Sequence, residues 1–409
     1  MRYWWITGLV FFSACQKPAP EPAETKKTAA SAQAAQTSAA LEPPSTPLEV
    51  SNPGDKPRKA ANVTLALSEL GSVPAWNLAL FEGEQELPLQ VDDVDADGNP
   101  DTLAFQVDLG PKETKRLELV QKPPKRFPKR TRAVVHQEYE GPGWESDLVA
   151  YRLYLDGRNA IDVFGKMEPM LSLDRYAKSG KTYHEIEPWG VDVLHVGDSL
   201  GVGGFGFWIN DEVVKPVETL RTGEQKPLRR FVEIVAEGPV RSILRISYDN
   251  WVVDKEPRKV TSTMTIWAGK RWARSDLDLG SDFQPKVAVG IVAIEGAPVT
   301  QKDGLFFTYG LQSDPISDTK KPERLGLGVV FPKQEFSTYV DQARTAALPA
   351  AKDSSHVAVL TPDDQGHVYW GYLAAWERGS LGIRDPAAMQ AECETALFEL
   401  TNPISARRK

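Results

Sequence analysis

An arginine and a tyrosine share one face of a predicted strand in the segment LVAYRLY. Arg152 and Tyr154 are two residues apart, and alternate side chains of a strand point the same way. A guanidinium binds a carboxylate through two parallel hydrogen bonds, and an aromatic ring packs on a sugar ring. The pair therefore suits an acidic sugar. The alternative is that Arg152 forms an ion pair with Glu145 or Asp162 on a neighbouring strand.

Tyr183 and His184 are adjacent in a loop-like segment, and Asp192 follows them. The chain has 5 histidines, and an imidazole exchanges protons near neutral pH, so His184 is a candidate acid/base group. The alternative is a histidine held by structural hydrogen bonds. On the first interpretation the predicted catalytic set is Arg152, Tyr183, His184 and Asp192.

These residues fit three kinds of reaction on a uronate. In an elimination or dehydration, Arg152 neutralises the sugar carboxylate while His184 and Tyr183 share the proton transfers. A hydrolase needs two carboxyl groups about 5 to 9 Å apart, and the candidates for these are Glu145, Asp192 and Glu295. An epimerase would pair His184 with Glu295.

Alternating polar residues in WARSDLDLG place Trp272, Arg274 and Asp276 on one face of a predicted strand. A sheet face that carries tryptophan and charged groups is a common surface for sugars. The alternative is a solvated sheet face. The residues predicted to contact substrate are Trp144, Glu145, Tyr154, Trp189, Trp272 and Glu295.

The segment DDVDADGNPD has the spacing of a calcium-binding loop. Ca²⁺ prefers six to eight oxygen ligands, and alternating carboxylates with a glycine at the tight turn supply most of them. Ala104 stands where an EF-hand has its bidentate glutamate, so a hairpin between two strands is the closer pattern. We expect a structural Ca²⁺ rather than a catalytic one; the alternative is a surface hairpin without metal. The predicted ligands are Asp93, Asp95, Asp97 and Asp101.

The N-terminus has the features of an export signal. Residues 1–14 contain Arg2 and a short apolar run, and small residues precede Cys15, which resembles a bacterial lipobox. We therefore expect lipidation at Cys15 and a membrane anchor; the alternative is an ordinary signal peptide. Gln16 in place of aspartate favours the outer membrane, on its periplasmic or surface face. Lipidation leaves Cys393 as the remaining cysteine.

The rest of the chain divides into four predicted segments. Residues 15–58 are rich in Ala, Pro, Glu and Ser and are expected to form a disordered tether. Short alternating runs predict a small β-sandwich-like unit over 59–121 and a large β domain over 133–405, with a helix near residues 385–398. The basic, proline-rich segment 122–132 is interpreted as a linker, with an anionic-ligand patch as the alternative.

The charge of the chain limits its partners. It has 409 residues and a formal net charge of −8, with no long basic face. Nucleic-acid binding depends on clustered lysine and arginine, so nucleic acid is not an expected partner. A glycan is compatible with this balance.

Several of these motifs occur, in the same order, in a known family. DDVDADGNPDTLAFQVDL, WESDLVAYRLY, the Tyr-His pair, GVDVLHVGDSLGVGG and VAVGIVAIEG resemble the DUF4861 family. The resemblance implies a mostly β protein with a galactose-mutarotase-like supersandwich and few helices. It also implies a secreted protein of polysaccharide-using bacteria. We therefore expect a protein that acts on uronate-containing glycans, as a lyase, dehydratase or hydrolase; the alternative is a non-catalytic carbohydrate-binding lipoprotein.

Overall fold

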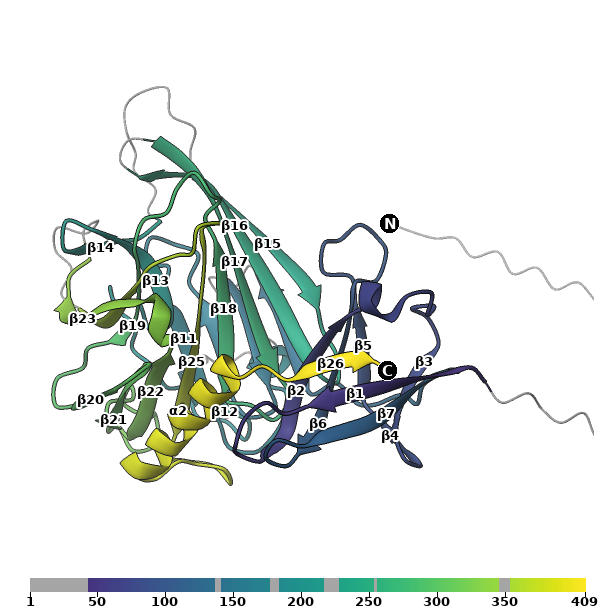
Figure 1. Cartoon of the computed structure of the whole chain (residues 1–409). Coiled ribbons are helices and arrows are strands. Elements are labelled where there is room, and N and C mark those ends of the chain that lie inside the picture. The colour runs from purple at the N-terminus through teal and green to yellow at the C-terminus, as the bar shows by residue number, and fades with distance from the viewer. Residues whose placement is uncertain (1–42, 137–140, 177–183, 217–227, 254–255, 346–353) are drawn as a thin grey trace, which may run out of the picture. The chain divides into compact units, whose positions relative to one another are not determined.

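The computed structural model describes residues 43–136, 141–176, 184–216, 228–253, 256–345 and 354–409 (Figure 1). The predicted signal peptide, Cys15 and Tyr183 lie outside the described residues. Antiparallel strands dominate the described part, which contains two α-helices, α1 (Leu173–Tyr176) and α2 (Pro386–Thr401). The predicted mostly β fold with few helices is confirmed.

Two small sheets form the N-terminal unit and enclose their own apolar core, which includes Leu48, Val63 and Phe105. One sheet has the order β26 (Ser405–Arg408), β1 (Ser45–Ser51), β7 (Thr114–Gln121), β3 (Leu78–Glu82) and β4 (Gln85–Leu87). The other has the order β2 (Arg58–Ala66), β6 (Thr102–Leu109) and β5 (Leu89–Asp92). A 3₁₀ turn over Leu67–Leu70 follows β2.

The predicted tether ends too late, because part of residues 15–58 is folded. Strand β1 pairs with β7 on one side and with β26, from the C-terminal end of the chain, on the other. Leu48 and Val50 alternate into the core with no exposed surface. The proline, serine and glutamate around these two residues resemble tether composition, whereas the alternation of the buried residues is that of a strand.

The main body has two layers of sheet. The first layer consists of two sheets, which a parallel bridge between Ile161 and Gly201 connects. The first of these sheets has the order β12 (Gly190–Asp192), β11 (Ile161–Lys166), β10 (Ala150–Leu153), β9 (Gly141–Ser146) and β8 (Thr131–His136). The second sheet has the order β14 (Glu212–Val214), β13 (Val202–Ile209), β19 (Val287–Val292), β24 (Ser355–Leu360) and β23 (Phe336–Ala343). Gly201 has φ +69°, and a Cβ there would meet the Ile161 carbonyl oxygen at 1.9 Å, so only glycine fits.

The second layer is a sheet of eight strands. Its order is β15 (Arg229–Ala236), β16 (Arg241–Val253), β17 (Glu256–Trp267), β18 (Trp272–Asp278), β25 (His367–Trp376), β22 (Arg324–Val330), β21 (Leu305–Leu311) and β20 (Val299–Lys302). The inner faces of both layers enclose the main core. Tyr151 crosses this core: its hydroxyl donates to the Arg271 carbonyl and accepts from the Ala374 N–H. The layers match the supersandwich that the family resemblance implied.

Helix α2 covers the outer face of the second layer at β21, β22 and β25 (Figure 1). It begins where predicted: Asp385 caps it by accepting a hydrogen bond from the Ala388 N–H, and Pro386 occupies its first turn. Met389 and Cys393 pack on β22, where Gly326 and Gly328 leave room for them. Among the residues that the structure describes, neither helix is long and apolar enough to cross a membrane.

Candidate functional site

A buried network of charges lies at one end of the first layer. Arg152 on β10 is directly opposite Asp162 on β11, and Asp192 lies on the adjacent strand β12. The Arg152 guanidinium forms ion pairs with both carboxylates, at 3.3 Å in the case of Asp192, and donates to the Tyr154 hydroxyl. Arg152 and Asp162 have no exposed surface. The predicted ion pair of Arg152 with Asp162 is therefore formed.

The pKa of both aspartates is raised, chiefly by burial. Burial raises the pKa of Asp192 well above its usual value, and the negative charge of Asp162 raises it further, while Arg152 acts in the opposite direction. Burial also raises the pKa of Asp162. Burying three charges costs considerable desolvation energy. Perturbed carboxylates of this kind concentrate at functional sites, although structural ion pairs share the property.

His184 lies over the network and faces solvent. Its Nδ1 is 3.8 Å from the Asp192 Oδ2, and the side chain of His184 is 58% exposed while that of Asp192 is 2% exposed. This distance is longer than a hydrogen bond between the two atoms. Hydrogen bonds at catalytic sites are often long without ligand and shorten when ligand binds. The structure thus brings together Arg152, His184 and Asp192 of the predicted set.

A second histidine that the sequence reasoning missed lies close to this network. His195 Nδ1 is 3.7 Å from the Asp314 Oδ1, and the Asp314 N–H donates to the Val193 carbonyl just after β12. The charge of Asp314 contributes to the raised pKa of Asp192. The available signal was the spacing of His195, three residues after Asp192 in VDVLHVG.

Five of the six predicted substrate contacts are buried, and one of these five is Trp272. Trp144 and Trp189 lie under neighbouring aromatic rings, those of Tyr151 and Phe164. Two more, Tyr154 and Glu145, have their polar atoms engaged within the protein. Glu145 binds Lys166 and accepts hydrogen bonds from the Ser172 and Leu173 N–H groups, so it supports the segment after β11 instead.

Arg152 is likewise wrongly predicted to contact the substrate carboxylate. Its guanidinium is fully buried and already faces two carboxylates. A third carboxylate would have to be desolvated beside the first two, which is unfavourable. Arg152 therefore contacts Asp192 from the buried side, and this arrangement gives no support to a direct contact with a substrate carboxylate.

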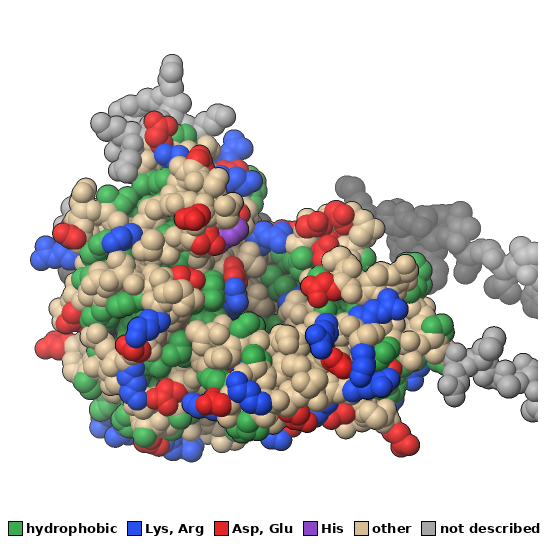
Figure 2. All heavy atoms as spheres, in the orientation of Figure 1, with side chains coloured by type: hydrophobic (Ala, Val, Ile, Leu, Met, Phe, Trp, Pro, Cys, Tyr) green, Lys and Arg blue, Asp and Glu red, His purple; other side chains and the backbone are tan. Residues whose placement is uncertain are grey.

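Trp272, on the outer face of the other layer, is 8% exposed, packs in the cluster under α2 and donates its Nε1–H to Glu399 Oε2 (3.0 Å). With Arg241, Arg274 and Glu399 it lines a hollow of about 330 Å³ between the eight-stranded sheet and the N-terminal unit. Figure 2 shows this hollow with acidic and basic side chains on its walls. Arg274 pairs with Asp276 (Nε to Oδ1, 2.9 Å) and lies over the Tyr369 ring.

The hollow continues into a second one of about 420 Å³, which shares Arg58, Trp272 and Glu399 with it. The walls of the second hollow are mainly basic, with Lys56, Lys59, Lys270 and Arg271 against Glu392 and Glu394. We call the two hollows together the basic groove. Such a surface suits an anionic polymer.

Glu295 lies in a third hollow, of about 710 Å³, together with Tyr339, Asp341 and His356. The lining of this hollow does not include His184. The predicted pairing of His184 with Glu295 therefore receives no support, and Glu295 belongs with His356.

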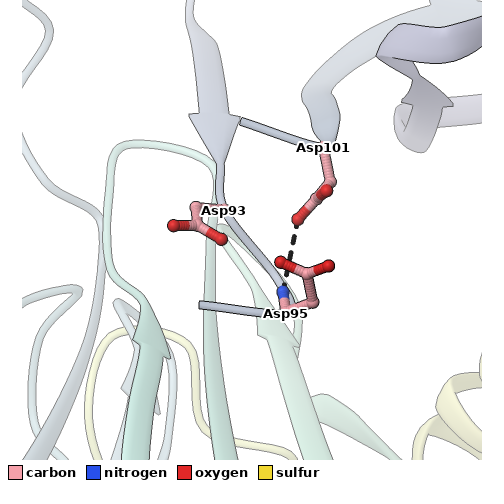
Figure 3. A group of neighbouring side chains, drawn as sticks. All are labelled: Asp93, Asp95 and Asp101. Carbon is pink, nitrogen blue, oxygen red and sulfur yellow. Dashed lines mark hydrogen bonds between the residues drawn. The ribbon is translucent and has the colours of Figure 1, made fainter. Parts of the chain in front are cut away.

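Three of the four predicted calcium ligands converge. The carboxylate oxygens of Asp93, Asp95 and Asp101 lie within 4.8 Å of one another (Figure 3). Asp97 instead accepts a hydrogen bond from the Asn99 N–H and is not part of the group. Gly98 has φ +91°, as the tight turn requires. Three clustered carboxylates fit Ca²⁺ in donor type, although Asp93 and Asp101 also accept backbone N–H groups of the loop.

The sequence of the folded part also matches a family model. The match to the family described as "Domain of unknown function (DUF4861)" spans residues 50–406, so the chain belongs to this family. It is 25% identical over 321 residues to "Uncharacterized protein P7" from Formosa agariphila, which covers 70% of this chain and 73% of that protein.

Two solved structures from Enterococcus faecalis are also similar. One is a protein in glycosyl hydrolase family 38 (TM-score 0.49, 11% identity, 89% of this chain and 47% of that chain). The other is an alpha-mannosidase (TM-score 0.48, 10% identity, 89% of this chain and 46% of that chain). The chain spans about half the length of these two proteins.

Proposed function

We propose that this protein is an exported lipoprotein enzyme that acts on uronate-containing oligosaccharides or polysaccharides, with His184 as its acid/base group. One observation carries the proposal: an exposed imidazole lies next to a buried carboxylate that a buried arginine holds in place. A histidine with only a structural role at the surface does not require a buried Asp192–Arg152 pair beneath it, and burying that pair costs desolvation energy.

The arrangement suits an elimination. His184 Nδ1 lies 3.8 Å from Asp192 Oδ2. In the proposed step the His184 imidazole takes the proton on the carbon next to the uronate carboxyl, the bond from the neighbouring carbon to its oxygen breaks, and a carbon–carbon double bond forms. Asp192 stabilises the imidazolium that results. His195, next to Asp314, is the candidate that protonates the leaving oxygen.

The second candidate function is carbohydrate binding without catalysis, and the basic groove favours it. The chain carries a net charge of −8, yet Lys56, Lys59, Lys270 and Arg271 gather in this groove. Glu392, Glu394 and Glu399 share the walls with these cations, and Lys270 pairs with Glu399 (Nζ to Oε1, 2.6 Å). The basic groups are nevertheless in excess, and an excess of positive charge in a cleft concentrates anionic ligands such as a uronate polymer.

One experiment separates the two functions. The purified protein is incubated with a panel of uronate-containing oligosaccharides, and product masses are read together with ultraviolet absorbance. An elimination gives an absorbing unsaturated product, and a hydrolysis adds one water per cleaved bond. If the substrates bind but remain unchanged, and if the double variant Lys59→Ala/Lys270→Ala binds them less well, the protein is a carbohydrate-binding protein without catalysis.

The anchor is proposed from residues 1–15 and needs its own test. Cys15→Ala is expected to move the protein from the detergent-soluble membrane fraction to the aqueous fraction after expression in a bacterium with an outer membrane. Cys393→Ala is the matched control, since Cys393 is buried and free. Membrane association of Cys15→Ala equal to that of the parent would contradict lipidation.

A further inference from the structure

The hollow that contains Glu295 is bounded by the segment after β19, by β20 and by the edge strand β23. Its volume of about 710 Å³ lies within the range of ligand sites in proteins. Beyond the backbone, its walls carry an imidazole, a phenol, two carboxylates, two amides and a hydroxyl, from His356, Tyr339, Glu295, Asp341, Gln301, Gln342 and Ser354.

The pairing of β23 with β24 builds a polar cluster into this wall. Tyr339 is opposite Ala358, and Asp341 follows on the same strand near His356. The His356 Nδ1 is 2.5 Å from the Asp341 Oδ1 and 3.2 Å from the Tyr339 hydroxyl. Because an ionised carboxylate only accepts hydrogen bonds, the contact with Asp341 places the imidazole proton on Nδ1. The other ring nitrogen, Nε2, is then an acceptor.

His356 is positioned more firmly than the other histidines of the described region that form ion pairs. Its side chain is 6% exposed, against 58% or more for His184, His195 and His367. Burial lowers the pKa of His356, so the imidazole is neutral at pH 7. A neutral ring fixed in one tautomer is ready to accept a hydrogen bond from a ligand.

The charges on the walls decide which ligand fits. Glu295 and Asp341 contribute negative charge, and the described residues that line the hollow include no lysine or arginine. An anionic ligand such as a uronate is therefore disfavoured here, in contrast to the basic groove. Among the described residues, the group with the spacing of a metal site is that of Asp93, Asp95 and Asp101. Carboxylates, amides and an imidazole acceptor suit the hydroxyl groups of a neutral sugar.

We propose that this hollow is a second ligand site, which binds a neutral sugar unit through His356, Asp341, Tyr339 and Glu295. It is separate from the site of His184 and does not depend on the proposed activity there. A glycan that contains both uronate and neutral sugars would present a ligand to each site.

The test follows the imidazole resonances of His356 by nuclear magnetic resonance while sugar is added to the whole protein. The probes are galactose, rhamnose and xylose as neutral sugars and galacturonate as the charged counterpart of galactose. His356→Gln assigns the resonance. At least one neutral sugar is expected to shift it in a saturable manner, and galacturonate is expected to leave it unchanged.

Two conservative variants test the polar cluster. Asp341→Asn and Tyr339→Phe keep the shape of the wall and are each expected to weaken sugar binding about tenfold, the effect of losing one good hydrogen bond. Asp282→Asn, an exposed carboxylate elsewhere (85% exposed), is the control. His184→Ala is expected to bind the neutral sugar normally even where it abolishes turnover of uronate substrates.

Three results would overturn the proposal. These are a His356 resonance that no neutral sugar shifts, galacturonate binding as strong as that of galactose, or full binding by both variants with thermal unfolding unchanged.

Discussion

His184 and Asp192 form an exposed–buried pair, with the imidazole Nδ1 3.8 Å from a carboxylate that has almost no contact with solvent. Arg152 holds the far side of the same carboxylate at 3.3 Å. The line from Asp162 through Arg152 and Asp192 to His184 thus runs from the sheet to the surface.

Asp192→Asn is expected to reduce turnover by about 100-fold or more, because an amide cannot stabilise the imidazolium of His184. Stability is expected to be kept or to rise, since Asp192 and Asp162 are buried carboxylates that repel each other. Turnover and urea unfolding measure the two effects. Asp211→Asn, on an exposed turn, is the control. A variant with normal turnover would show that the carboxylate plays no part in the reaction.

Arg152→Met is expected to destabilise the protein by about 3–5 kcal/mol, because it leaves two buried carboxylates without their shared cation. Chemical denaturation measures the change in the free energy of unfolding. Arg158→Met, at a partly exposed ion pair with Asp156, is expected to cost less than about 1 kcal/mol. Equal losses for the two variants would contradict the role given to the buried arginine.

Ca²⁺ is expected to raise the melting temperature of the whole protein, since a ligand that binds only the folded state stabilises it. Asp95→Asn should remove most of this increase. Asp97→Asn should retain it, because Asp97 lies outside the group of three carboxylates. Differential scanning calorimetry with Ca²⁺, Mg²⁺ or a chelator makes the comparison. A wild-type melting temperature that does not respond to Ca²⁺ would leave the loop as a plain surface hairpin.

Glu335 gives stability a pH dependence of known sign. Burial, assisted by the charges of Asp363 and Asp276, raises its pKa from 4.5 to about 7. Between these values the folded state holds a proton that the unfolded state has released, so stability falls as pH rises from about 4.5 to 7. Glu335→Gln is expected to flatten this part of the curve of melting temperature against pH. Identical slopes for Glu335→Gln and the parent would contradict the raised pKa.

Much of the β fold could be predicted from local patterns. In the run VRSILRISYD, buried and partly exposed residues alternate from Leu244 to Asp249, and the run forms β16 as expected. Helix α2 follows the cap and proline at Asp385 and Pro386. Strand β1 was missed because its partners, β7 and β26, are distant in sequence. No local pattern reports such pairing.

The candidate site was only partly predictable. The residue types and the strand pattern indicated a site with charged groups at Arg152, His184 and Asp192. An ion pair of Arg152 with a neighbouring strand was one of the two interpretations that the sequence left open. Burial was not predictable, because it depends on what packs above a strand face: Trp144 and Trp189 proved to be core residues. The cluster of His356 and Asp341 depends on a strand register with irregularities, which sequence spacing does not reveal.

The most direct measurement compares His184→Ala with His367→Ala on the uronate-containing substrate that the wild-type protein converts fastest. The two histidines are equally exposed, at 58%, and each lies within 4 Å of an aspartate. They differ in that the partner of His184 is buried and the partner of His367 is 58% exposed. The account predicts that His184→Ala loses at least about 100-fold in turnover while His367→Ala keeps its activity. Undiminished turnover by His184→Ala would contradict it.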